Sequence, residues 1–245
     1  MADRRRAPLL AVVGATGGVG ATLIACATAE VWGAAASGGL LIDAAGRRGA
    51  VASLLDIDGE GTAALTRLGA AVDGAAVAAA SVPRAGSLVL TAGAATVGGA
   101  AAAALVDCAT AEHAWVVVDC GAVATTEALA ALSAAGLIAV CARPDVPSAQ
   151  VARRLVADLD RLGPSRRPPA VLALTPVRRG RLAGARMAAA VGLRLAGQVR
   201  DAPAVVGRWA DGGLPVGTIA AARRGVAADL RALAGALWSA PEWGT

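Results

Sequence analysis

Several residue types on which common enzyme sites depend are missing from this sequence. Its 245 residues contain no Lys, Tyr or Phe, and His113 is the one histidine. The chain therefore cannot form a lysine Schiff base or a Tyr–Lys hydride-transfer pair, and it has no two histidines to share a metal. No G-x-S-x-G elbow is present to serve His113 in a Ser–His–Asp triad. These absences remove several enzyme classes before any motif is considered.

Charged and aromatic residues are scarce as well. Hydrophobic residues make up 56% of the chain, charged residues 17% and aromatic residues 2%, with a mean hydropathy of +0.60. A chain this apolar is not disordered, and its length allows a sizeable core. All 23 basic residues are arginine and the net charge is +5, which permits an acidic partner without specifying one.

The cysteines show none of the spacings of a disulfide framework or a zinc site. Cys26, Cys108, Cys120 and Cys141 lie in apolar runs, and no C-x-x-C pair occurs. Buried, reduced thiols are the expected state of such residues, and reduced thiols are typical of a cytosolic protein. We therefore expect a cytoplasmic location.

The first residues also imitate an export signal. Arg4–Arg6 precede an apolar run, and small residues follow at Ala25–Ala29. Glycines at 14, 17, 18 and 20 interrupt that run, which a helical signal segment tolerates poorly. The same stretch fits a strand, a glycine loop and a helix, and we prefer this interpretation. No other segment supplies the roughly 20 uninterrupted apolar residues of a membrane span.

Short apolar runs alternate with alanine-rich stretches of helical length. Because these runs are continuously apolar, they indicate strands buried on both faces, as in a parallel sheet covered by helices. We therefore predict a doubly wound, mostly parallel α/β fold with helices on both faces, forming a single domain over residues 8–245 behind a basic tail at 1–7. Strands are expected at Leu9–Val13, Leu40–Ile42, Leu88–Leu90, Trp115–Val118, Leu137–Cys141, Val171–Leu174 and Leu195–Val199.

A glycine-rich loop follows the first expected strand and precedes a helix. Glycines allow a backbone turn at positive φ, and free N–H groups at a helix start attract anions. With Asp43 ending the next strand, the pattern favours phosphate binding over a tight turn that holds no ligand. The candidate nucleotide-binding residues are Gly17, Gly18, Val19, Gly20, Ala21 and Thr22.

This loop resembles the deviant Walker A motif of the MinD/ParA group of P-loop ATPases. That motif runs Lys-Gly-Gly-x-Gly-Lys-Thr, and the aligned stretch here is Thr16–Thr22. The glycines and Thr22 match, whereas Thr16 and Ala21 replace both lysines. The family's lysine offsets charge in the transition state, so its loss implies slow or absent hydrolysis more than lost binding.

The resemblance continues beyond the loop. Leu40–Asp43 resembles the strand that ends in the family's Asp, although Ala45 replaces a frequent second acid. Trp115–Asp119 resembles the Walker B strand, which implies that Asp119, with Thr22, holds Mg²⁺ and leaves Asp43 as the one catalytic candidate. Thr175 stands at the family's usual base-contacting Asn. The tail from Asp201 to the last helix is also similar, and the CpaE-like and TadZ-like branch fits best.

A second resemblance concerns the loop alone. Gly14–Gly20 is similar to the Gly-Ala-Thr-Gly-x-x-Gly loop of atypical short-chain dehydrogenases. With neither catalytic Tyr nor Lys, that family would leave an NADP-sensing relative, in which Asp43 binds a ribose and Arg47 or Arg48 a 2′-phosphate. Asp119 at the end of a valine strand, together with the tail, favours the ATPase resemblance.

The preferred resemblance implies a degenerate ATPase that binds ATP or ADP with Mg²⁺ and acts as a spatial regulator or scaffold. Its partners would be a pilus or secretion assembly or the division machinery, with a homodimer as a further expectation. An interaction scaffold with no ligand is the remaining alternative.

Two late segments have a second interpretation each. Arg178, Arg179, Arg181 and Arg186 are expected on a solvated helix face, with DNA binding as the alternative. The last helix, near 220–238, carries a leucine stripe that is expected to cover the sheet, with a peripheral membrane contact as the alternative.

Overall fold

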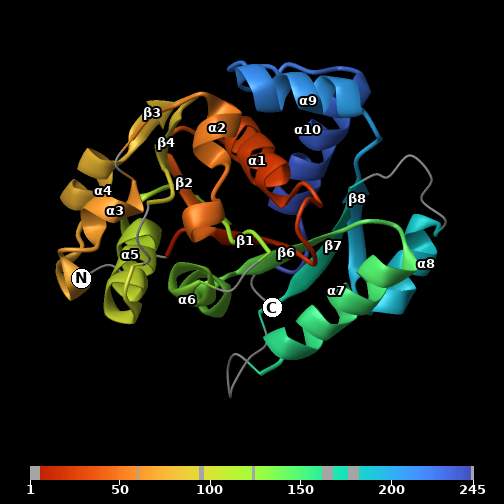
Figure 1. Cartoon of the computed structure of the whole chain (residues 1–245), viewed down its shortest axis with the longest axis horizontal. Coiled ribbons are helices and arrows are strands. Elements are labelled where there is room, and N and C mark those ends of the chain that lie inside the picture. Colours follow the sequence, from red (N-terminus) through yellow and green to blue (C-terminus); the bar gives the residue numbers. More distant parts are fainter. Residues whose placement is uncertain are drawn as a thin grey trace.

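The fold is built on one eight-stranded sheet, seen near edge-on at the centre of Figure 1. The computed structural model describes residues 6–59, 61–93, 97–122, 125–161, 168–175 and 182–243. Strand order is β3-β4-β2-β5-β1-β6-β7-β8, and every pairing is parallel except that of β3 with β4. The strands are β1 Leu9–Gly14, β2 Gly39–Asp43, β3 Val82–Arg84, β4 Ser87–Leu90, β5 Val116–Asp119, β6 Leu137–Ala142, β7 Ala170–Leu174 and β8 Arg194–Gln198.

Helices cover both faces of this sheet. One face packs against α1, α2, α9 and α10, and the other against α3 to α8. The helices are α1 Ala21–Ala35, α2 Val51–Leu55, α3 Thr62–Leu65, α4 Gly74–Ala80, α5 Gly99–Glu112, α6 Thr126–Ala134, α7 Val146–Leu159, α8 Gly184–Val191, α9 Pro203–Gly212 and α10 Gly225–Trp238, with short 3-10 turns η1 Gly46–Arg48 and η2 Gly69–Ala71. The predicted doubly wound α/β class is confirmed.

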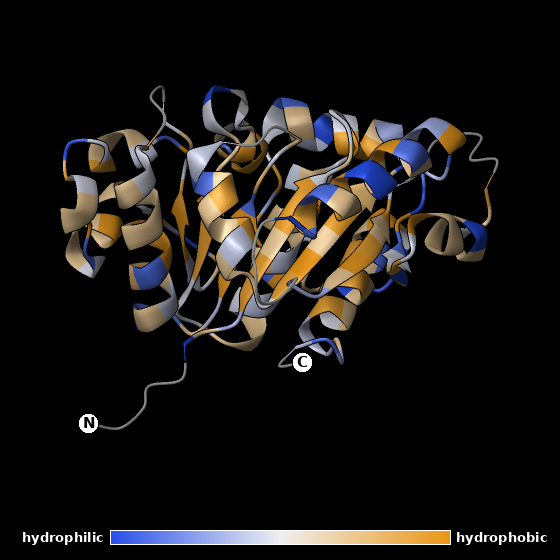
Figure 2. Cartoon of the chain, turned by 90° about the horizontal axis from the view of Figure 1, so that it is seen from below, coloured by the Kyte–Doolittle hydropathy of each residue, from blue (hydrophilic) through white to orange (hydrophobic). Residues whose placement is uncertain are grey.

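The apolar strands form the centre of the core. Residues of β1, β5 and β6 are buried along their whole length, and Figure 2 shows strongly hydrophobic strands with helices of mixed hydropathy around them. Because both faces of each central strand meet a helix layer, continuous apolar runs were the correct signal for these strands. The strand β3 was not predicted.

Smaller expectations have mixed outcomes. Cys26, Cys120 and Cys141 are buried, but Cys108 lies partly exposed on α5, so the prediction of full burial is wrong for it. All four thiols are free. Within the segment 1–29 that imitates an export signal, the residues from Leu9 onwards form β1, the glycine loop and the first part of α1. None of the helices in the described ranges is long and apolar enough to cross a bilayer.

Candidate functional site

The glycine loop joins β1 to α1 at the carboxyl edge of the sheet. Gly18 and Gly20 have φ values of 71° and 79°, and Gly20 is the left-handed residue just before α1. Such angles disfavour residues with a side chain, which explains why glycine occupies these positions. The predicted strand–loop–helix arrangement is confirmed.

The backbone N–H groups in the middle of this loop have no partner among the described residues. Its entry is fixed, because the Gly14 N–H donates to the Gly121 carbonyl and the Ala15 N–H to the Cys141 carbonyl, both at 2.8 Å. From residue 16 to residue 20, by contrast, no N–H donates to any described residue. These donors stand at the positive end of the 15-residue helix α1, an arrangement that attracts an anion.

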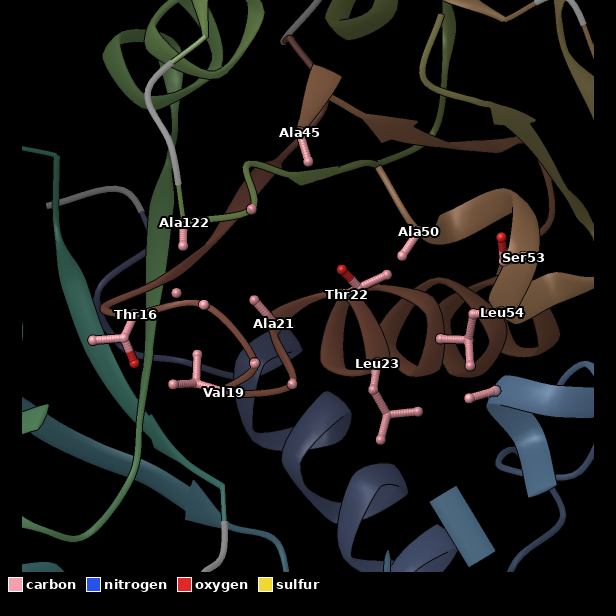
Figure 3. A pocket seen from close by; sticks show the side chains of 16 residues that line it. Thr16, Val19, Ala21, Thr22, Leu23, Ala45, Ala50, Ser53, Leu54 and Ala122 are labelled. Atoms are coloured by element: carbon pink, nitrogen blue, oxygen red, sulfur yellow. The ribbon is translucent and has the colours of Figure 1, made fainter. Parts of the chain in front are cut away.

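A cavity of about 520 Å³ opens over the loop. Its walls are small side chains from the segments after β2 and β5 and from α2 and α9. Figure 3 shows Ala21 and Thr22 at the start of α1, with Ala45, Ala50 and Ala122 around the same space. The lining residues are Gly14, Thr16, Gly17, Gly18, Val19, Gly20, Ala21, Thr22, Leu23, Ala45, Ala50, Ser53, Leu54, Gly121, Ala122 and Ala210. All six candidate nucleotide-binding residues line the cavity.

Asp119 ends β5 and is fully buried. Its Oδ1 accepts a hydrogen bond from the Gly121 N–H at 3.0 Å, whereas Oδ2 has no partner among the described residues. Burial raises the pKa of this carboxyl, and the nearby Thr22 hydroxyl lowers it. A buried carboxylate oxygen without a donor is costly, and Glu127 Oε2 is a second such atom; the expected role of Asp119 in holding a metal stays a prediction.

Asp43 is aligned with Asp119 on the neighbouring strand β2. Its Oδ1 accepts from the Ala45 N–H at 3.0 Å and its Oδ2 from the Val51 N–H at 3.1 Å. Burial, and then the charge of Asp119, raises the pKa of Asp43 to about 7. Since both oxygens hold backbone amides, the contacts of Asp43 serve the turn after β2, and its catalytic role stays a prediction.

The donor set fits Mg²⁺ in the way that nucleotide sites hold it. Mg²⁺ takes oxygen ligands and is commonly bound by one or two carboxylates together with substrate phosphates. Asp119 Oδ2 and the Thr22 hydroxyl offer such oxygens next to the loop. In the described part of the chain no group of three or more metal-binding side chains occurs, so this protein's residues alone do not form a complete cage.

The chain has no lysine, and Ala21 offers only a methyl where the motif that the loop resembles has lysine. A different cation contacts the loop: Arg143, just after β6, donates from Nη2 to the Gly18 carbonyl at 2.8 Å. Sequence reasoning missed this contact, because it depends on β6 lying beside β1.

A second cavity of about 150 Å³ adjoins the loop on the side of β7 and β8. Its lining is largely apolar and includes Val199, Pro203 and Val206, with Leu23 from α1. Thr175, predicted at the base-contacting position, also lines it and donates its hydroxyl to the Ala142 carbonyl at 3.4 Å. Apolar space beside the amides of residues 16–20, here termed the anion cradle, suits a ring attached to a phosphate chain.

The strand order does not favour the dehydrogenase alternative. In that fold the strand after the glycine loop pairs directly with the first strand. Here β5 lies between β1 and β2, and the Asp43 oxygens hold backbone amides instead of facing the loop. An NADP site built from Asp43 with Arg47 or Arg48 is therefore not supported.

The predictions for the late arginines and for the last helix have different outcomes. Arg178, Arg179 and Arg181 lie outside the described residues, whereas Arg186 is exposed on α8. On α10, Leu230, Leu233 and Leu237 are buried in the core next to α1, as the sheet-covering interpretation expects. That stripe is therefore not free to enter a membrane, although Trp238 beside it is 46% exposed.

No protein-family model matches this sequence, and neither does any curated protein. Solved structures do match its fold. A ParA family ATPase from Chlorobium tepidum TLS superposes with a TM-score of 0.82 at 13% identity, over 94% of this chain and 98% of that one. The septum site-determining protein MinD from Pyrococcus horikoshii OT3, complexed with Mg-ADP, gives 0.79 at 12% identity, over 98% and 100%. MinD in the MinC:MinD complex of Aquifex aeolicus gives 0.78 at 17% identity, over 95% and 96%. The chain thus has the MinD/ParA fold.

Proposed function

We propose that this chain is a nucleotide-binding protein of the MinD/ParA type that holds ATP or ADP with Mg²⁺. One observation carries the proposal: the N–H groups of residues 16–20 donate to none of the described residues and belong to a loop that lines a large cavity at the start of α1. Asp119 and Thr22 are the residues that would hold the metal, which when bound would neutralise phosphate charge. A structure of the same fold contains Mg-ADP, which supports this choice of ligand.

Hydrolysis is expected to be slow or absent. Ala21 offers no donor to the phosphates, and the chain has no lysine that could take its place. An arginine matches lysine in charge, but its planar fork does not occupy the same position as an ammonium. The loop amides, the dipole of α1 and Thr22 can still bind the phosphates, so we expect nucleotide binding to persist where hydrolysis is slow or absent.

The role that fits a binding protein with little turnover is a nucleotide-responsive spatial regulator or scaffold of the CpaE-like branch. We propose partners in a pilus or secretion assembly or in the division machinery, and a homodimer as the functional unit. The solved MinC:MinD complex, in which a protein of this fold joins a cell division partner, supports such a role. Peripheral membrane association stays a prediction, since the leucines of α10 are in the core.

Equilibrium binding and turnover of ATP on the purified chain test the proposal. We expect ATP and ADP with Mg²⁺ to raise the thermal midpoint, NADPH and NADH to leave it unchanged, and phosphate release to stay near background. Asp119→Asn should keep the fold and weaken the effect of Mg²⁺ on affinity. If millimolar ATP with Mg²⁺ does not bind, the nucleotide account is wrong and the ligand-free scaffold is the better explanation.

A further inference from the structure

Arg143 contacts the glycine loop from the end of the neighbouring strand β6. It follows Ala142, the last residue of β6, and β6 pairs with β1, whose end begins the loop. Its Nη2 donates to the Gly18 carbonyl at 2.8 Å, and a Cβ built on Gly18 would lie 3.5 Å from the same nitrogen. Arg143 is a partly buried residue, and its guanidinium thus contacts the central glycine of the loop.

This contact fixes the direction of one cradle donor. In a trans peptide the C=O and the following N–H point in opposite directions. Because the Gly18 carbonyl is held towards Arg143, the Val19 N–H points away from it. That N–H donates to no described residue, and Val19 lines the cavity. Arg143 therefore fixes the direction of an N–H group in a residue that lines the cavity.

The positive charge of Arg143 is also available. Among the described residues no carboxylate pairs with it, although several other arginines have such partners. Arg200, which lines the second cavity, binds Asp229 through Nε at 2.7 Å and Nη2 at 2.9 Å. The residues lining the large cavity include no charged side chain. Arg143 thus bonds to the loop while its charge is paired with no described carboxylate.

We propose that Arg143 is a positioning residue for a nucleoside polyphosphate, and this inference rests on the proposed nucleotide binding. It orients the Val19 N–H and adds a positive charge next to the glycine loop. Both lysines of the Walker A motif are replaced in this chain. The guanidinium of Arg143 is bonded to the Gly18 carbonyl. It therefore supports binding of the phosphate chain and does not replace the lysine of the motif.

Three variants test this role by titration with ATP, ADP and AMP in the presence of Mg²⁺. Arg143→Gln removes the charge, and Arg143→Lys keeps it without the fork. Arg153→Gln is the matched control, because Arg153 is exposed on α7 and pairs with no described carboxylate. We expect Arg143→Gln to weaken ATP about tenfold and AMP much less, with a flatter salt dependence, Arg143→Lys to be intermediate, and Arg153→Gln to match wild type.

Each other outcome has a defined meaning. Equal ATP affinity in wild type and Arg143→Gln overturns the role of Arg143 and leaves the proposed function standing. Equal losses for ATP and AMP, or a lowered thermal midpoint without ligand, mark a structural role and also overturn it. If wild type binds none of the three nucleotides, both the proposed function and the role of Arg143 are wrong.

Discussion

The two ends of α1 differ in how their polar groups are satisfied. At its carboxyl end, Trp32 donates its indole N–H to the Ala234 carbonyl at 3.0 Å, and Trp115 donates to the Ala36 carbonyl at 2.7 Å. The two rings meet edge to face with centroids 5.8 Å apart. At its amino end, the N–H groups of residues 16–20 and the Asp119 Oδ2 have no partner among the described residues.

The contrast separates structural from functional demands on one helix. A buried polar group without a partner costs free energy, so a fold tolerates it mainly where a ligand completes it. The tryptophan end therefore stabilises the fold, and the loop end fits the proposed binding of a ligand. An experimental result opposite to the expected one would weaken this contrast between the two ends of α1.

The largest effect is expected at the tryptophan end. Trp32 is 2% exposed, so Trp32→Ala should lower the free energy of unfolding by about 4 kcal/mol, measured by urea denaturation. The change leaves a cavity and removes the donor to Ala234. ATP affinity of the folded protein should not change, because the residue is far along α1 from the loop.

Trp238→Ala is the matched control for Trp32→Ala. Trp238 contacts Trp32 with centroids 4.8 Å apart but is 46% exposed, so it should lose less than half as much stability. If the two substitutions cost the same, or if Trp32→Ala weakens ATP binding in the folded protein, the division of roles along α1 is wrong.

The second effect concerns the buried acids of the loop end. The pKa of Asp43 is raised to about 7, so between about pH 4 and pH 7 the folded chain binds more protons than the unfolded chain. The contribution of Asp43 to stability therefore falls as pH rises through that window. Relative to wild type, Asp43→Asn should gain stability by about 1.4 kcal/mol for each pH unit in the window.

Urea unfolding of both proteins across this pH range measures the difference. Asp107→Asn serves as the control, because Asp107 is an exposed carboxylate paired with Arg6 at 2.6 Å. Its difference from wild type should show no comparable slope. If the difference in free energy of unfolding between Asp43→Asn and wild type did not change with pH, the pKa of Asp43 would not be raised in the folded chain. Burial of this carboxylate would then not lower stability.

The smallest effect on stability is expected at the loop glycines. Gly20 has φ 79°, and a Cβ there would lie 3.4 Å from Thr175 Cγ2. Gly69, with φ 54° and open space around a Cβ, is a control outside the loop. Each change to Ala should cost about 1 kcal/mol of stability, since both force a side chain into left-handed backbone. Only Gly20→Ala should weaken ATP binding in a titration; equal ATP affinity in both variants would contradict the cradle.

The parallel strands could be predicted from sequence because their signal is local. Runs such as Leu9–Gly14 are apolar at every position and are buried on both faces. The edge strand β3 gave no such signal: it has three residues, Val82–Arg84, with a proline in the middle, which in a sequence favours a turn or an edge.

The residues of the candidate site also differ in whether their signal is local in the sequence. The glycine loop and Asp119 follow from short motifs, since a strand, a turn and a helix are consecutive in the chain. Arg143 could not be predicted, because its contact with Gly18 joins residues 125 positions apart and depends on which strand lies beside β1. The bond from the Val51 N–H to Asp43 Oδ2 joins residues eight positions apart and was not predicted either, and the catalytic role of Asp43 stays a prediction.

The most direct test of the central claim observes the loop amides themselves. A titration of the ¹⁵N-labelled chain with ATP and Mg²⁺ would follow the backbone N–H signals of Gly17, Gly18, Val19 and Gly20. The account predicts that these signals shift together and saturate, while those around Trp32 stay in place. Saturating shifts elsewhere with an unchanged loop, or no shifts at all, would contradict it.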